Sequence, residues 1–132
     1  DAHRSLDGSK IDTVLLEVGI GGRYDATNVY TAPTACAITT LDLDHTRVLG
    51  DTLEKIAWEK GGIIKDGCPV VSAVQEPGPA KVLQDCADEK KAELTFVRDA
   101  SDFVDPEWKL GLKGDFQREN AALAIMLTRM LV

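Results

Sequence analysis

The sequence lacks a long apolar run, a surplus of basic residues and paired cysteines, and each absence excludes a class of protein. No apolar run approaches the roughly 18 residues that a membrane-spanning helix needs, so we expect no membrane span. No charged-then-apolar signal stretch opens the chain. Cys36, Cys68 and Cys86 are odd in number, widely spaced and without a CxxC pair, which indicates free thiols in a reducing compartment.

Acidic residues outnumber basic ones by 22 to 15, which gives a net charge of −7. A general nucleic-acid binder needs a basic face to neutralise phosphates, so this balance argues against a nucleic-acid partner. Apolar residues make up 44% of the 132 residues. Because this share is ordinary for a globular chain, disorder is not expected. The length suffices for one modest domain.

The chain alternates between apolar runs of strand length and longer amphipathic segments. The pattern predicts strands over residues 11–19, 35–43, 69–74, 94–97 and 108–112. It predicts helices from a cap at residues 51–52 to about residue 65, over about 80–91, and over 114–131. Because strands alternate with helices, the predicted fold class is α/β, a mainly parallel sheet flanked by helices.

Two polar side chains stand near the carboxyl ends of predicted strands. Glu17 lies near the end of the first apolar run, and His45 follows the second. In parallel sheets, ligands bind in the crevice outside the carboxyl ends of the strands. We therefore expect Glu17 and His45 at the carboxyl ends of adjacent strands. From the residues alone, a solvated strand-end glutamate and a structural histidine remain alternative interpretations.

Lys60 and Asn120 interrupt apolar helical stripes. Lys60 lies four residues after Ile56, on the stripe that also holds Ile64. A lysine on an inward helix face must be paired, change its charge state or extend to the edge, and a chemically altered lysine is a further alternative. Asn120 lies in the stripe of the last helix. Its amide can bond either the edge of a ligand or the local backbone.

The glycine-rich string at residues 19–22 follows a predicted strand, as a phosphate-binding loop would. It lacks the full G-x-G-x-x-G spacing, which makes a dinucleotide-binding module the weaker interpretation. No G-x-x-x-x-G-K-[ST] segment occurs in the chain. If the protein uses ATP, the backbone cradle for the triphosphate is therefore absent from this sequence.

Three blocks of sequence carry a resemblance to a known family. The first is residues 17–28 (EVGIGGRYDATN). The second joins residues 44–46 (DHT) to 49–63 (LGDTLEKIAWEKGGI), and the third is residues 114–124 (GDFQRENAALA). In order and spacing these blocks resemble the folylpolyglutamate synthases, which belong with the Mur-type ligases. The resemblance extends over residues 11–131.

The resemblance implies an ATP-dependent ligase that adds L-glutamate to the γ-carboxyl of a folate through an acyl phosphate. It implies Glu17 and His45 as magnesium ligands. It also implies that Lys60 becomes carbamylated and offers a carboxylate to the metal site. Gln117 and Asn120 match family positions near the nucleotide, with Asn120 at the adenine. The implied cofactors are ATP and Mg²⁺, and Mg²⁺ needs few protein ligands because it keeps several waters.

The chain departs from the family pattern in two ways. Asp42 stands where the family usually has glycine, and the family's phosphate loop and C-terminal domain are expected before and after this sequence. We therefore expect residues 1–132 to be the later part of the central ATP-binding domain, inactive by itself. We expect the full-length enzyme to act on folate and L-glutamate as a cytoplasmic monomer, with a mitochondrial pool if its source is eukaryotic. Nucleic-acid and membrane partners are not expected.

Two other functions remain as alternatives. Dihydrofolate synthases and bifunctional enzymes share the three blocks, and only Tyr24, Trp58 and Gly61 favour a folylpolyglutamate synthase of eukaryotic type. A non-catalytic, truncated binding module is the alternative of another class, and the missing phosphate loop favours it. A G-x-x-G-K-[ST] segment upstream in the reading frame would decide between an enzyme and such a module.

Overall fold

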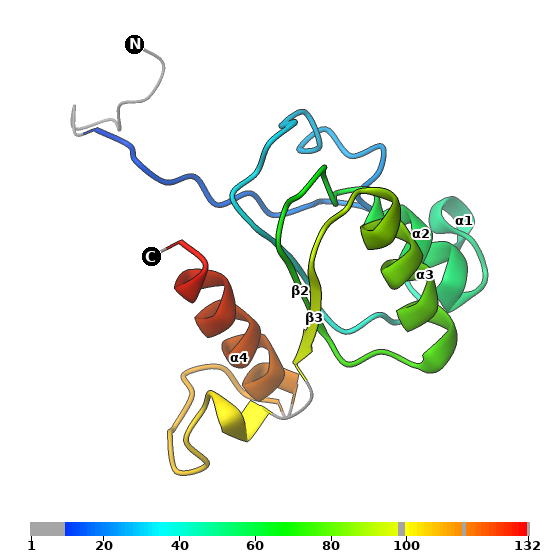
Figure 1. Cartoon of the computed structure of the whole chain (residues 1–132). Helices are drawn as coiled ribbons and strands as arrows, with labels where there is room; N and C mark the ends of the chain where they lie inside the picture. Colours follow the sequence, from blue (N-terminus) through cyan, green and yellow to red (C-terminus); the bar gives the residue numbers. More distant parts are fainter. Residues whose placement is uncertain (1–9, 98–99, 115, 132) are drawn as a thin grey trace.

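The computed structural model describes residues 10–97, 100–114 and 116–131 (Figure 1). In chain order, the elements are β1 (Cys36–Ile38), α1 (Thr46–Leu49), α2 (Leu53–Gly61), β2 (Val70–Ala73), α3 (Pro77–Glu89), β3 (Leu94–Val97), the 3₁₀ turn η1 (Ala100–Asp102) and α4 (Phe116–Arg129). Strands and helices alternate along most of the chain, as the sequence predicts.

The strands of the described residues form one parallel sheet, in the order β1-β2-β3. Cys36 pairs with Val70, and Val70 pairs with Leu94. Parallel neighbours need a crossover connection. Helices supply it here, with α1 and α2 between β1 and β2, and α3 between β2 and β3. The predicted fold class, a parallel sheet flanked by helices, is confirmed.

Helices cover both faces of the sheet (Figure 1). On one face, α2 and α3 pack together around buried Ile56, Val70 and Leu83. On the other face, α4 brings Leu123 into a second core with Val71 of β2. Neighbouring residues of β2 thus belong to different cores. This explains why β2 is buried along its whole length, as expected of a strand covered on both sides.

The starts of two helices lie close to their signals in the sequence, whereas α2 ends at Gly61, four residues before its expected end. Thr52 accepts a hydrogen bond from the backbone N–H of Lys55 at 3.3 Å and caps α2, as predicted. α3 begins at Pro77, three residues earlier than expected, because proline fits the first turn of a helix. The four-residue helix α1 is not predicted, since it is too short to show an apolar period. No described helix is long and apolar enough to cross a membrane.

The predicted strand over residues 11–19 is wrong. Residues 11–18 have no regular secondary structure, and Val14, Leu15 and Leu16 are exposed, with Leu15 at 83%. An apolar run becomes a strand only when a neighbouring strand completes its hydrogen bonds. The sheet of the described residues offers no such neighbour to this segment.

The predicted strand over residues 108–112 is also wrong. The chain is a loop there, and the side chain of Arg118 in α4 binds the loop by hydrogen bonds. The guanidinium donates to the carbonyls of Asp105, Pro106 and Trp108. Within the predicted strand, the Trp108 carbonyl is therefore satisfied by a side chain, and the sheet of the described residues has no strand beside this segment.

All three cysteines are free and buried, which confirms the predicted free thiols. The Sγ atoms of Cys68 and Cys36 lie 3.7 Å apart. Burial, together with the neighbouring Cys68, raises the pKa of the Cys36 thiol to about 12. This thiol is therefore protonated at neutral pH, and it packs as part of the core.

Leu83→Ala should lower the free energy of unfolding by about 2–5 kcal/mol, because its truncation leaves a cavity in the core. Leu83 is fully buried between α2 and α3. Leu112→Ala is the matched control. Leu112 is 70% exposed, so its loss should change the free energy of unfolding by at most about 0.5 kcal/mol. Urea unfolding followed by circular dichroism measures both, and equal effects would contradict the described core.

Candidate functional site

A glycine-rich turn follows Glu17, and the carboxylate of Asp25 holds it. One carboxylate oxygen of Asp25 accepts hydrogen bonds from the backbone N–H groups of Gly19 at 3.2 Å and Ile20 at 3.0 Å. The other oxygen accepts a hydrogen bond from the backbone N–H of Thr27 at 2.9 Å. The Thr27 hydroxyl and these N–H groups lower the pKa of Asp25 from 3.8 to about 2. The carboxylate therefore stays ionised and keeps the turn in shape.

This glycine turn (residues 19–22) lies against the last turn of α2. A side chain at Gly22 would place its Cβ 3.2 Å from the Cα of Lys60 and 3.0 Å from the carbonyl oxygen of Glu59. Gly21 has a φ of 69°, and a Cβ there would come within 2.8 Å of the Leu49 side chain in α1. Both positions therefore need glycine. In this way the turn after Glu17 touches α1 and α2.

An open pocket of about 300 Å³ lies between the glycine turn, α1 and α2. Its walls combine apolar side chains with two carboxylates. The lining residues are Ile20, Tyr24, Asp25, Ala26, Val48, Leu49 and Glu59. The oxygens of Asp25 already accept hydrogen bonds from the turn. Glu59 is therefore the pocket carboxylate that is better placed to accept a hydrogen bond from a ligand.

His45 lies between β1 and α1 in an unusual backbone conformation. Its φ of 49° and ψ of 36° are left-handed, which is uncommon for a residue other than glycine. Its N–H donates to one carboxylate oxygen of Asp44 at 2.7 Å, and its Nε2 lies 3.5 Å from the other oxygen. The side chain is 48% exposed. The imidazole is therefore accessible, in the segment that leaves the carboxyl end of β1.

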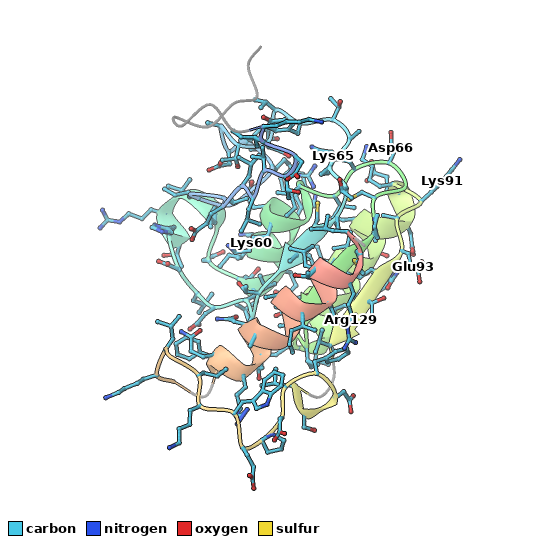
Figure 2. All side chains as sticks on the ribbon, turned by 90° about the vertical axis from the view of Figure 1, so that its left-hand side faces the viewer. Lys60, Lys65, Asp66, Lys91, Glu93 and Arg129 are labelled. Carbon is cyan, nitrogen blue, oxygen red and sulfur yellow. The ribbon has the colours of Figure 1, made fainter. Side chains whose placement is uncertain are left out.

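Lys60 is half-buried in the last turn of α2 (Figure 2). Ile56 and Ile64, its neighbours on the predicted stripe, are fully buried. The glycine turn covers the backbone of Lys60 at Gly22. Lys60 thus lies at the edge of the apolar stripe, where its side chain keeps access to solvent.

Glu17 is exposed and belongs to no strand. The prediction that Glu17 and His45 follow adjacent strands is therefore wrong for Glu17, whereas His45 does lie beyond β1. The reason is the missing pairing of residues 11–18 described above. Glu17 is connected to the site through the glycine turn that begins two residues after it.

Gln117 and Asn120 lie in the first half of α4, where Asn120 donates a hydrogen bond to Oε1 of Gln117 at 3.3 Å. Their neighbour Glu119 accepts a hydrogen bond from the hydroxyl of Thr40 at 3.0 Å. Thr40 follows β1. This contact therefore places the start of α4 at the carboxyl end of the sheet, beside the segment that leads to His45.

Gln75 is a residue of this region that sequence reasoning missed. Its Oε1 accepts the N–H of Leu41 at 3.0 Å, and its Nε2 donates to the carbonyl of Thr39 at 3.0 Å. Gln75 follows β2, so it fastens the segment after β1 to the neighbouring strand end. The crevice rule that singled out Glu17 and His45 would have found it if applied to the third predicted strand.

Among the described residues, no three carboxylate, imidazole or thiol groups form a cluster that could hold a metal ion. Glu17 and His45 offer one carboxylate and one imidazole, both accessible. Mg²⁺ needs few protein donors, because this ion keeps several waters and takes further oxygens from phosphate groups. Lys60 as an ammonium has no lone pair to offer. It fits the ion only in carbamylated form.

Asp25→Asn should destabilise the protein at neutral pH, because the amide keeps the shape of the side chain but loses the charge that the N–H groups bind. A lowered pKa means that this stabilisation is complete above 3.8 and is lost as the pH falls through about 2. The difference in unfolding free energy between the two proteins should be constant down to about pH 4 and shrink below it. Urea unfolding at several pH values measures the difference. A gap that widens on acidification would contradict the described turn.

The chain is similar in sequence to curated folylpolyglutamate synthases. It is 47% identical to the human "Folylpolyglutamate synthase, mitochondrial" over 120 residues, which are 89% of this chain and 20% of the human protein. No protein-family model matches the chain.

Solved structures show the same likeness in three dimensions. An FPGS structure in complex with AMPPCP and folate matches with a TM-score of 0.76 and 34% identity, over 87% of this chain and 32% of that one. E. coli FolC in complex with DHPP and ADP matches with a TM-score of 0.69 and 32% identity, over 89% of this chain and 31% of that one. The chain thus spans about a fifth of the length of its curated relatives. Over that span, in sequence and in fold, it is similar to folylpolyglutamate synthases.

Proposed function

We propose that the full-length protein is a folylpolyglutamate synthase, an ATP-dependent ligase that adds L-glutamate to the γ-carboxyl group of a folate. The observation that carries the proposal is the contact between two of its motifs, in which the glycine turn after Glu17 packs on the backbone of Lys60. Two residues with implied metal-site roles thus belong to segments in direct contact. The 47% identity to the human enzyme supports the same function.

The reaction must activate a carboxylate, which is a poor electrophile at neutral pH. Transfer of the γ-phosphoryl group of ATP to a carboxylate oxygen gives an acyl phosphate and releases ADP. The amine of glutamate then attacks the acyl carbon, the C–O bond to phosphate breaks, and a proton leaves the nitrogen as the amide forms. Charge gathers on phosphate oxygens in the first step, so the task of the protein is positioning and electrostatic stabilisation.

Glu17 and His45 are the proposed ligands of Mg²⁺. They come from the segments that precede the glycine turn and α1. When bound, Mg²⁺ neutralises charge on the phosphate oxygens. Carbamylation of Lys60 replaces its cation with a carboxylate and so completes the donor set. All three residues act as a scaffold for the metal, and none acts as a nucleophile.

Gln117 and Asn120 are the proposed contacts to ATP, because an amide can both donate to and accept from the edge of adenine. The FPGS structure that holds AMPPCP and folate supports ATP and folate as ligands. We assign part of the folate to the pocket between the glycine turn, α1 and α2. Its apolar walls suit a planar ring, and Glu59 can accept hydrogen bonds from ring N–H groups.

We further propose that the full-length enzyme is a monomer that acts on folate and L-glutamate without nucleic-acid or membrane partners. A cytoplasmic enzyme with a mitochondrial pool is the proposed location, and the name of the human relative supports the mitochondrial part. The 132-residue segment by itself is expected to be inactive, because its sequence holds no phosphate-loop motif.

Dihydrofolate synthesis is the second candidate reaction. The match to E. coli FolC favours it, because that structure holds DHPP and ADP. The two activities differ in the carboxylate that receives glutamate, which belongs either to dihydropteroate or to a folate. Offering each substrate to the full-length protein with ATP, Mg²⁺ and glutamate, and identifying the products by mass spectrometry, decides between one activity and both.

Glu17→Ala and His45→Ala in the full-length protein should each lower the rate of glutamate ligation by about 10²–10³-fold, the range for loss of one electrostatic contact to a transition state. Both side chains are exposed, so the free energy of unfolding should change by no more than about 0.5 kcal/mol. Ligation assays and urea unfolding measure the two effects. Activity that falls only because folding is lost would argue against both assignments.

Lys60→Ala in the full-length protein should abolish most of the ligation activity, and added acetate should restore part of it. The carbamylated lysine carries a carboxylate, which the small acid replaces in the space left by truncation. Lys60→Arg should gain nothing from acetate, since it keeps a cation where an anion is required. Intact mass of the full-length protein at high bicarbonate, with Mg²⁺ and nucleotide, tests the modification directly. A fully active Lys60→Ala variant together with unmodified lysine would refute this role.

A further inference from the structure

The last turn of α2 is capped by residues of the first motif. A helix leaves its final carbonyl groups without partners inside the helix, and Gly62 does not take the left-handed conformation that commonly ends helices. Instead, Nη2 of Arg23 donates a hydrogen bond to the carbonyl of Trp58 at 3.0 Å. The backbone N–H of Arg23 donates a hydrogen bond to the carbonyl of Glu59 at 2.8 Å. Nδ2 of Asn28 donates to the carbonyl of Gly62 at 3.1 Å.

Neighbouring groups hold Arg23 in place on several sides. Its guanidinium carbon lies 3.7 Å from the centre of the Trp58 ring, a cation–π contact. Asn28 also donates to the carbonyl of Arg23 at 3.0 Å. A side chain at Gly62 would overlap Arg23. Burial raises the pKa of Cys86 in α3, and the charge of Arg23 partly offsets the rise, so the guanidinium also lies near this thiol.

Both the charge and the shape of arginine matter for this contact. A cation near the end of a helix is stabilised by the partial negative charge of the unpaired carbonyls. Lysine supplies the charge but has no planar group that can lie on a ring and donate in its plane at the same time. The Nε of Arg23 is buried without a hydrogen-bond partner among the described residues. The contacts to Trp58 therefore come from Nη2, which donates to the carbonyl, and from the face of the guanidinium, which lies on the ring.

Lys60 lies inside this contact. The carbonyls that Arg23 and Asn28 bind come from residues on both sides of Lys60, and Gly22 packs close to its Cα. We propose that Arg23, supported by Asn28, is the positioning residue that fixes the backbone of Lys60 for the ligation reaction. The proposal rests on the proposed function, and Arg23 acts through Lys60 without touching a substrate.

Amide hydrogen exchange measures the order of this turn independently of activity. In the full-length protein, Arg23→Lys should speed exchange at residues 62–64 by at least about tenfold, the effect of losing one good hydrogen bond. The N–H groups of these residues bond to carbonyls of the same turn. The N–H of Ile56 bonds to the carbonyl of Thr52 at the start of α2, and its exchange rate should not change. Equal acceleration at both ends of α2 would overturn the proposal.

Asn28→Asp is the second variant, and it tests the same contact if Arg23→Lys does not fold. It has the same size as asparagine but no N–H to donate, so it should produce the same local change at residues 62–64. Each variant should lower kcat for ligation by about 10- to 100-fold, as the loss of residues that orient a metal ligand does. The KM for folate should change little. Unchanged kcat and unchanged exchange in both variants would refute the role of Arg23.

The Lys60→Ala background separates positioning from a general structural effect. If Arg23 acts through Lys60, Arg23→Lys should cause no further loss of rate in that background. An equal loss with and without Lys60 would overturn the proposal.

Arg129→Lys is the matched control. The guanidinium carbon of Arg129 lies 5.5 Å from the Phe103 ring centre, and Figure 2 shows Arg129 on α4, a different element from that of Lys60. This variant should leave both kcat and exchange at residues 62–64 unchanged. A wild-type protein without ligation activity would refute the proposed function. The exchange rates would still decide whether Arg23 and Asn28 hold the turn.

Discussion

The close approach of the glycine turn to the end of α2 is the contact on which the rest of the site depends. Backbone meets backbone there, because Gly22 has no side chain to keep Lys60 away. Asp25 shapes the turn from within, and Arg23 attaches it to α2. The pocket is the space that remains between this turn and the two helices it touches. Any side chain added at Gly22 would therefore separate the two motifs and change the pocket at the same time.

The sheet and the longer helices could be predicted because their signals are local. β3 occupies the expected residues 94–97, and the cap of α2 is found at Thr52. Residues 11–19 show where a local pattern fails. Their composition is that of a strand, but a strand exists only beside another strand, and pairing is a tertiary property. α1 fails for a different reason, because four residues cannot display a helical period.

The sequence motifs indicated which residues belong to the site, but not which groups those residues contact. Resemblance singled out Glu17 and Lys60, but not the glycine contact that connects their segments. Gln75 and Arg23 each bind a backbone carbonyl far along the chain, Gln75 at a separation of 36 positions and Arg23 at 35. A carbonyl group is present at every residue. The sequence therefore gives no sign of which carbonyl a side chain will meet.

The 35-residue separation between Arg23 and the carbonyl of Trp58 also bears on the order in which the chain folds. Closing a loop of this length costs conformational entropy, and contacts between distant residues form late for that reason. α2, β2, α3 and β3 follow one another with short connections, so they can assemble before the loop closes. Cys36 of β1 pairs with Val70 of β2 across a loop of similar length, so the first strand and the glycine turn face a similar closure cost. The site around Lys60 and the edge of the sheet are thus joined to the same local unit, α2 to β3, by closures of similar reach.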